Sequence, residues 1–153
     1  MSGDKNFPSA EANEYNFRLA QRNLRHAGAR ASALRMLSED AAKTFQDAYF
    51  DWIYLDALHT EEAIARDLQV WWPKLRPGGL LSGDDYGDAE DTEHVPARRW
   101  KSKFGTVAGN PNDGPWGTCR ALQAFARRHC AVLHVTWMHD CYPYPAWYLI
   151  KPW

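Results

Sequence analysis

The stretch from residue 50 to residue 86 constrains the fold of this chain more than any other part of it. A run of β-forming apolar side chains ends in Asp56, and a helical pattern follows over residues 60–75. A second apolar run then ends in Asp84 and Asp85. This order of strand, helix and strand predicts two neighbouring parallel strands joined by a right-handed crossover. Because the first run is almost unbroken, we expect its strand to be buried on both faces.

The patterns elsewhere predict one three-layer α/β domain over residues 1–153. Its last two strands are expected to form an antiparallel pair. Residues 1–11 are expected to be flexible, and residues 87–115 to form a long loop or lid. The periodicity places helices at 12–27, 38–45, 60–75 and 116–129, and strands at 31–37, 51–56, 80–83, 131–138 and 146–150.

Composition narrows the class of protein. The net charge is −1, from 18 basic and 19 acidic residues, so no overall field attracts the chain to nucleic acid or to a membrane. No apolar run is long enough to span a bilayer, and the amino-terminal residues lack the features of a secretory signal. The three cysteines form no paired motif, which is typical of a reducing compartment. We therefore expect a soluble, cytoplasmic protein.

Three carboxylates are expected at one edge of the sheet, where neighbouring parallel strands end. Asp56, Asp84 and Asp85 would repel one another and hold raised pKa values unless a cation lies among them, and oxygen ligands suit Mg²⁺ or Ca²⁺. His59 follows Asp56 by three residues, so its imidazole is a candidate general base at the same edge. The alternative is that one aspartate caps a helix while the other side chains face water.

Four segments together resemble the class I S-adenosylmethionine-dependent methyltransferases, especially the small-molecule O-methyltransferases that include the macrocin-type sugar enzymes. The most specific segment is FDWIYLDALHTEEAIARDLQVWWPKLRPGGLLSGDDY, with its Asp-x-x-His, Pro-Gly-Gly and Asp-Asp-Tyr motifs. The others are YNFRLAQRNL, RMLSEDAAKTF and WGTCRALQAFA. The resemblance covers roughly three quarters of the chain.

This resemblance implies a Rossmann-like, seven-stranded methyltransferase sheet with an antiparallel last strand. It also implies that this chain is truncated at its amino terminus, because the family's first two strands and its Gly-rich cofactor loop have no counterpart here. The implied cofactors are S-adenosylmethionine and Mg²⁺ or a similar divalent cation. The implied site residues are Asp56, Asp84 and Asp85 for the metal, His59 and Asp56 for catalysis, and Ser38, Glu39, Asp40 and Asp56 for the cofactor.

The leading hypothesis is methyl transfer to the hydroxyl of a small molecule, with Trp100, Phe104 and Trp116 shaping the acceptor pocket. A second hypothesis is a non-catalytic interaction module, because a missing half-sheet would leave the strand at 31–37 as an exposed edge. A second copy or a partner chain would then complete the sheet. A third is a metal-dependent transferase that acts on nucleotide sugars, since acidic strand ends also coordinate their phosphates.

Overall fold

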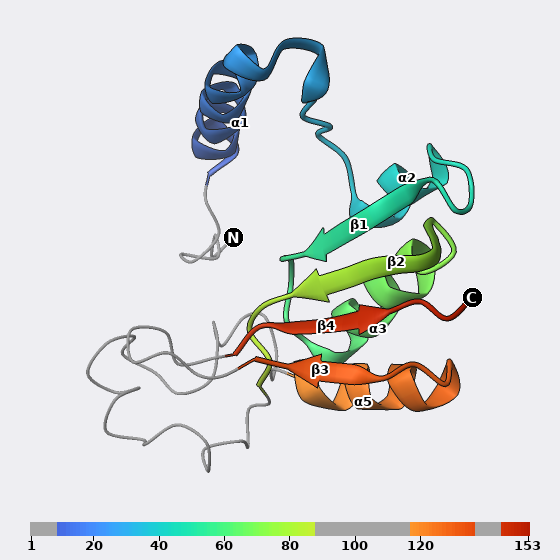
Figure 1. Cartoon of the computed structure of the whole chain (residues 1–153). Coiled ribbons are helices and arrows are strands. Elements are labelled where there is room, and N and C mark those ends of the chain that lie inside the picture. Colours follow the sequence, from blue (N-terminus) through green and yellow to red (C-terminus); the bar gives the residue numbers. More distant parts are fainter. Residues whose placement is uncertain (1–8, 88–116, 137–144) are drawn as a thin grey trace.

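The structure is a computed structural model that describes residues 9–87, 117–136 and 145–153, and these form an α/β fold (Figure 1). The helices are α1 (Ala10–Leu24), the 3₁₀-helix η1 (Arg25–Arg30), α2 (Ser38–Lys43), α3 (Glu61–Trp71) and α5 (Thr118–Arg128). The strands are β1 (Phe50–Leu55), β2 (Leu75–Gly83), β3 (Leu133–Val135) and β4 (Trp147–Ile150).

The four strands form one mixed sheet in the order β1-β2-β4-β3. β1 and β2 are parallel, as predicted for a strand–helix–strand unit. β4 is antiparallel to both of its neighbours, β2 and β3, which confirms the antiparallel last strand. The last strand in the chain therefore lies inside the sheet, between strands that precede it in the sequence.

One face of the sheet carries the hydrophobic core, because α3 and α5 both lie against it (Figure 1). Each helix buries one apolar stripe, which includes Ile64 and Leu68 on α3 and Leu122 and Phe125 on α5. The strands contribute alternate side chains to the same core, as expected from the two-residue period of a strand. The core consists of Ile53, Leu55, Ile64, Leu68, Trp72, Leu75, Leu81, Ala121, Leu122, Phe125, Ala126, Trp147 and Leu149.

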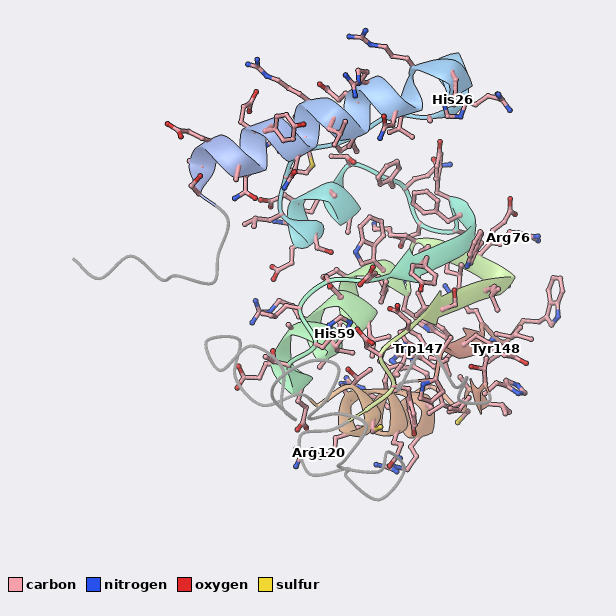
Figure 2. All side chains as sticks on the ribbon, turned by 90° about the vertical axis from the view of Figure 1, so that its left-hand side faces the viewer. His26, His59, Arg76, Arg120, Trp147 and Tyr148 are labelled. Carbon is pink, nitrogen blue, oxygen red and sulfur yellow. The ribbon has the colours of Figure 1, made fainter. Side chains whose placement is uncertain are left out.

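The opposite face of the sheet is covered by no helix that the structure describes. Trp52 is 61% exposed and Tyr54 is 51% exposed on this face. Arg76 and Tyr148 also point away from α3 and α5 (Figure 2). The prediction that the first strand is buried on both faces was therefore wrong. Two of the three expected layers are present among the described residues.

The segment 31–37, predicted as a strand, is irregular in the structure. A strand needs a neighbour for its backbone hydrogen bonds, and among the described residues β1 pairs only with β2. Arg35 instead pairs with Glu14 of α1, and its guanidinium lies 5.4 Å from the centre of the Phe17 ring. The segment thus connects the sheet to α1, which stands apart from it (Figure 1).

Helix α3 ends at Trp71, two residues before Pro73, because proline cannot continue an α-helix. The turn tightens there, because the Lys74 N–H donates to the Trp71 carbonyl at 3.0 Å. The Pro-Gly-Gly sequence at residues 77–79 lies within β2. The ammonium of Lys151 donates hydrogen bonds to the carbonyl oxygens of Trp72 at 2.8 Å and Leu75 at 2.7 Å. Trp72 is the C-cap of α3 and Leu75 is the first residue of β2, so Lys151 joins the end of the helix to the start of the strand.

His129 makes the stability of this core dependent on pH. Its ring centre lies 4.2 Å from that of Phe125 and 5.6 Å from that of Trp72. Burial, and then the charges of Arg128 and Lys151, lower the pKa of His129. The folded protein therefore binds this proton less tightly than the unfolded chain does. The resulting stability is present above the ordinary histidine pKa of about 6.5 and is lost as the pH falls through the lower folded value.

We expect the urea midpoint of the wild-type chain to fall between pH 7.5 and pH 5, and His129→Gln to reduce this fall. Unfolding followed by circular dichroism at several pH values measures the effect. His26→Gln is the matched control, because His26 lies exposed in η1. An equal fall with pH in the wild-type and His129→Gln proteins would contradict the assignment.

Candidate metal and cofactor site

The pairing of β1 with β2 places the two predicted aspartates side by side. The last matched pair is Leu55 with Gly83, and Asp56 and Asp84 are the next residues along each strand. A side chain at position 83 would place its Cβ 2.5 Å from the carbonyl oxygen of Leu55 and 2.6 Å from the indole of Trp147. Glycine at this position therefore permits the close approach that brings the two carboxylates together.

Asp56, His59 and Asp84 form a group that could hold a metal ion, since each offers a ligand atom and these atoms lie within 4.8 Å of one another. They come from the end of β1, the loop before α3 and the end of β2. Figure 2 looks onto this edge and shows His59 beside the start of α3. The loop is held by Thr60, the N-cap of α3, whose Oγ1 accepts a hydrogen bond from the Ala63 N–H at 3.3 Å.

Asp84 is the most constrained member of the group. Burial, followed by the negative charges of Asp85 and Asp56, raises the pKa of Asp84. Its Oδ1 is buried and has no hydrogen-bond partner among the described residues. The Tyr54 hydroxyl bonds to the same carboxylate, and the Trp147 indole donates to the backbone oxygen of Asp84 at 3.0 Å. A buried oxygen among like charges is the environment that a bound cation would stabilise, so these residues fit a divalent ion.

Asp85 lies beside His59 rather than in the group of three. Its Oδ2 is 3.4 Å from Nε2 of His59, and the two side chains are only 13% and 12% exposed. The backbone of Asp85 has a φ of 53°, a left-handed conformation that few non-glycine residues adopt. Of the three aspartates predicted to bind metal, the structure thus brings Asp56 and Asp84 together with His59.

Ser38, a predicted cofactor residue, is engaged within the chain. It is the first residue of α2, while Leu37 occupies the cap position without a side-chain hydrogen bond. The Trp71 indole donates to its Oγ at 2.8 Å, and the hydroxyl bonds to the buried carboxylate of Asp67. Burial, as the largest cause, raises the pKa of Asp67. Ser38 therefore joins α2 to α3.

Glu39 and Asp40, the other two predicted cofactor residues, also have partners. Glu39 lies 3.3 Å from the Arg66 guanidinium of α3, and Asp40 lies 2.8 Å from the Lys43 ammonium. Both pairs are exposed to solvent, where such pairs add little stability. A cofactor bound at this turn would therefore either compete with these side-chain contacts or contact the backbone of the turn instead.

Two residues that contact the site were missed in the sequence. Tyr54 lies two residues before Asp56, and side chains two apart along a strand point to the same face. This alternation could have predicted that Tyr54 lies near the site. No local pattern links Trp147 to Asp84, since that contact depends on β4 entering the sheet beside β2. The predicted acceptor-pocket residues, Trp100, Phe104 and Trp116, lie outside the described residues.

The match to known families agrees with this geometry. A family described as "Methyltransferase domain" matches residues 4–86, which is more than half of the chain and includes the whole acidic group. The chain belongs to this methyltransferase family. No curated protein sequence matches the chain.

Solved structures confirm the methyltransferase fold. An O-methyltransferase family protein from Burkholderia thailandensis superposes with a TM-score of 0.58 at 19% identity, over 88% of this chain and 41% of its own. A SAM-dependent methyltransferase from Thermotoga maritima, described as a possible histamine N-methyltransferase, superposes with a TM-score of 0.53 at 15% identity. The match covers 94% of this chain and 70% of the Thermotoga chain. A protein from Bordetella parapertussis, described as possibly exported, superposes with a TM-score of 0.57 at 15% identity. The match covers 94% of this chain and 51% of the Bordetella chain.

This methyltransferase-family chain spans about half of the length of the first solved structures that it resembles, with 51%, 41% and 57% of them covered. Among the residues that the structure describes, no helix combines the length and the apolar character needed to cross a membrane.

Replacing the half-buried charge at position 84 is expected to stabilise the metal-free protein. Asp84→Asn removes both the cost of burying a carboxylate and its repulsion from Asp85 and Asp56. In EDTA we expect the melting temperature to rise by roughly 2–4 °C, which corresponds to about 1 kcal/mol in a chain of this size. Differential scanning calorimetry measures it.

Glu62→Gln, an exposed change in the first turn of α3, is the matched control and should leave the melting temperature nearly unchanged. A lower melting temperature for Asp84→Asn than for wild type in EDTA would show that the carboxylate is stabilised by contacts within the chain.

Proposed function

We propose that this chain supports S-adenosylmethionine-dependent methyl transfer to the hydroxyl of a small molecule, assisted by a divalent cation. The observation that carries the proposal is that the family match spans the structural group of Asp56, His59 and Asp84. The solved structures of similar fold include proteins described as O-methyltransferase and SAM-dependent. They share the architecture with this chain at 15–19% identity, so the reaction is inferred from the site.

The acidic group suits the activation of a hydroxyl. A divalent ion, when bound, would supply positive charge that lowers the pKa of the substrate hydroxyl. The chain's part is to hold that charge in place. Asp56 is exposed and can reach an incoming ligand, whereas Asp84 is half-buried and is fixed by Tyr54. Positioning of the two reactants provides much of the rate in such transfers.

The methyl donor would lie over the carboxyl ends of the parallel strands, which is where open α/β sheets bind ligands. S-adenosylmethionine would supply an electrophilic methyl group on sulfur. The turn at residues 38–40 is the candidate for the adenine end, with Asp56 beside the reacting end. Because Ser38 is fixed by Trp71 and Asp67, this turn is held rigidly against α3.

His59 is the candidate proton acceptor for the substrate hydroxyl. Its Nε2 lies 3.4 Å from Oδ2 of Asp85, which places the ring at the acidic edge of the sheet. The same ring offers a ligand atom within 4.8 Å of those of Asp56 and Asp84.

Isothermal titration of the full chain with S-adenosylmethionine, with and without Mg²⁺, tests the proposed function. We expect binding in both conditions and tighter binding with the ion. Asp56→Asn should weaken binding at least tenfold in the presence of the ion. Asp51→Asn is the matched control, because Asp51 lies on the same strand in an exposed pair with Arg76. An absence of both heat and thermal shift would remove the enzymatic proposal for this chain.

A second candidate function is an interaction module, and the uncovered sheet face favours it. Within the described residues β1 is an edge strand, and Trp52 and Tyr54 are exposed beside that edge. Two copies related by a two-fold axis could pair β1 with itself and bury the same side chains on both sides. In this arrangement the exposed edge strand is β1, whereas the sequence analysis expected the edge at residues 31–37.

Size-exclusion chromatography with light scattering tests this candidate. An interaction module of this kind should have twice the 17.6 kDa of one chain, and Trp52→Lys should return it to a monomer. Tyr15→Lys, an equally exposed aromatic on α1, is the control. A wild-type monomer at micromolar concentration would argue against self-association through β1, whereas co-purification of another protein in defined ratio would point to a partner chain.

A further inference from the structure

We propose that residues 31–37 of one copy of this chain add as a strand to β1 of a second copy, at the edge that no described strand occupies. The exchange is reciprocal, so each copy both gives a segment and receives one. It goes beyond the proposed methyl transfer and does not depend on it. It also differs from the pairing of β1 with itself described above, because two different surfaces meet in each contact.

The chain carries two stretches of backbone that lack strand partners. Within the described residues β1 pairs with β2 alone, so its outer edge presents backbone donors and acceptors to solvent. Residues 32–36 make no backbone–backbone hydrogen bond with any described residue. An open strand edge is a template for a further extended segment, and each stretch supplies the groups that the other lacks.

The segment needs little rearrangement to become a strand. Ala31 at its start has φ −138° and ψ 140°, and Leu37 at its end has φ −65° and ψ 146°. Both pairs of angles lie in the extended region that strands use. The segment is therefore close to the conformation in which it would pair.

The side chains of the two stretches match in spacing and character. Side chains two residues apart on an extended segment share a face, so Leu34 and Met36 lie together. They are 52% and 46% exposed. Trp52 and Tyr54 have the same spacing on β1 and are 61% and 51% exposed. Set side by side, these residues form cross-strand pairs of an aliphatic and an aromatic side chain, which stabilise a sheet.

Contacts at both ends of the segment favour the edge of a second copy over that of its own β1. The Arg35 guanidinium pairs with Glu14 and lies 5.4 Å from the centre of the Phe17 ring, which fastens the segment to α1. The Ser38 hydroxyl that follows the segment accepts a hydrogen bond from Trp71 of α3. Between these points the segment leads away from the sheet toward α1 (Figure 1). Exchange of such an arm around a two-fold axis forms each contact twice.

Mixing two variants of the full chain tests the exchange by size-exclusion chromatography with light scattering. The arm variant, Leu34→Lys with Met36→Lys, keeps the β1 edge intact, and the edge variant, Trp52→Lys, keeps the segment intact. At tens of micromolar the wild-type chain should have twice the mass of one 17.6 kDa chain, and each variant alone should be a monomer.

An equimolar mixture of the two variants should form dimers again, because the intact segment of one can still bind the intact edge of the other. We expect the mixed dimer to be roughly tenfold tighter than either variant with itself. Val135→Lys, an exposed position on β3 at the opposite edge of the sheet, is the matched control and should remain a dimer. Circular dichroism checks that every variant is folded.

Three results of this experiment overturn the proposal. A wild-type monomer shows that the segment and the edge do not meet between copies. A dimer of the arm variant alone shows that β1 pairs with itself or that another surface is used. A mixture that stays monomeric shows that the two surfaces are not partners.

Hydrogen exchange of the wild-type chain gives a test that needs no variant. Backbone amides of residues 32–37 should exchange roughly tenfold more slowly at concentrations that favour the dimer than after dilution. Equal exchange at both concentrations overturns the proposal. Neither experiment uses S-adenosylmethionine, so failure here leaves the methyl-transfer proposal intact, and failure of cofactor binding leaves the exchange intact.

Discussion

The parallel pairing of β1 with β2 is the constraint on which the candidate site depends. Its register ends at Leu55 and Gly83, and the absence of a side chain at Gly83 lets the two backbones and the Trp147 indole come together. The next residue on each strand is an aspartate, so like charges meet at the sheet edge. Every other contact at the site, from Tyr54 to the Asp85–His59 pair, forms around this juxtaposition.

Much of this arrangement could be predicted because it is encoded locally. The helical period of Ile64, Leu68 and Trp72 marks the buried stripe of α3, and the Thr60 hydroxyl marks where the helix begins. Apolar runs that end in acids mark both strands of the parallel pair. Patterns of this kind need no information about distant residues. These patterns predicted the α/β class, the crossover between the parallel strands, and the sheet edge that Asp56 and Asp84 share.

The rest depends on contacts between residues far apart in the chain. Residues 31–37 have the composition of a strand, but in the described structure they have no strand to pair with and contact α1 instead. Ser38 has the chemistry of a helix cap, yet the Trp71 indole reaches it from α3. Asp85 has a left-handed backbone and lies beside His59, and the strand pattern that precedes it predicts neither feature. Sequence patterns report local preference, and these three positions are decided by tertiary neighbours.

The insertion of β4 between β2 and β3 has a consequence for the order of events during synthesis. β4 is made after both of its neighbours, so until it emerges from the ribosome β2 exposes the backbone edge that β4 will occupy. The Trp147 indole, which steadies the backbone of Asp84, arrives at the same late moment. The acidic turn can therefore reach its final shape only after β4 has been translated, and a nascent chain paused before Trp147 would present a half-built sheet to chaperones.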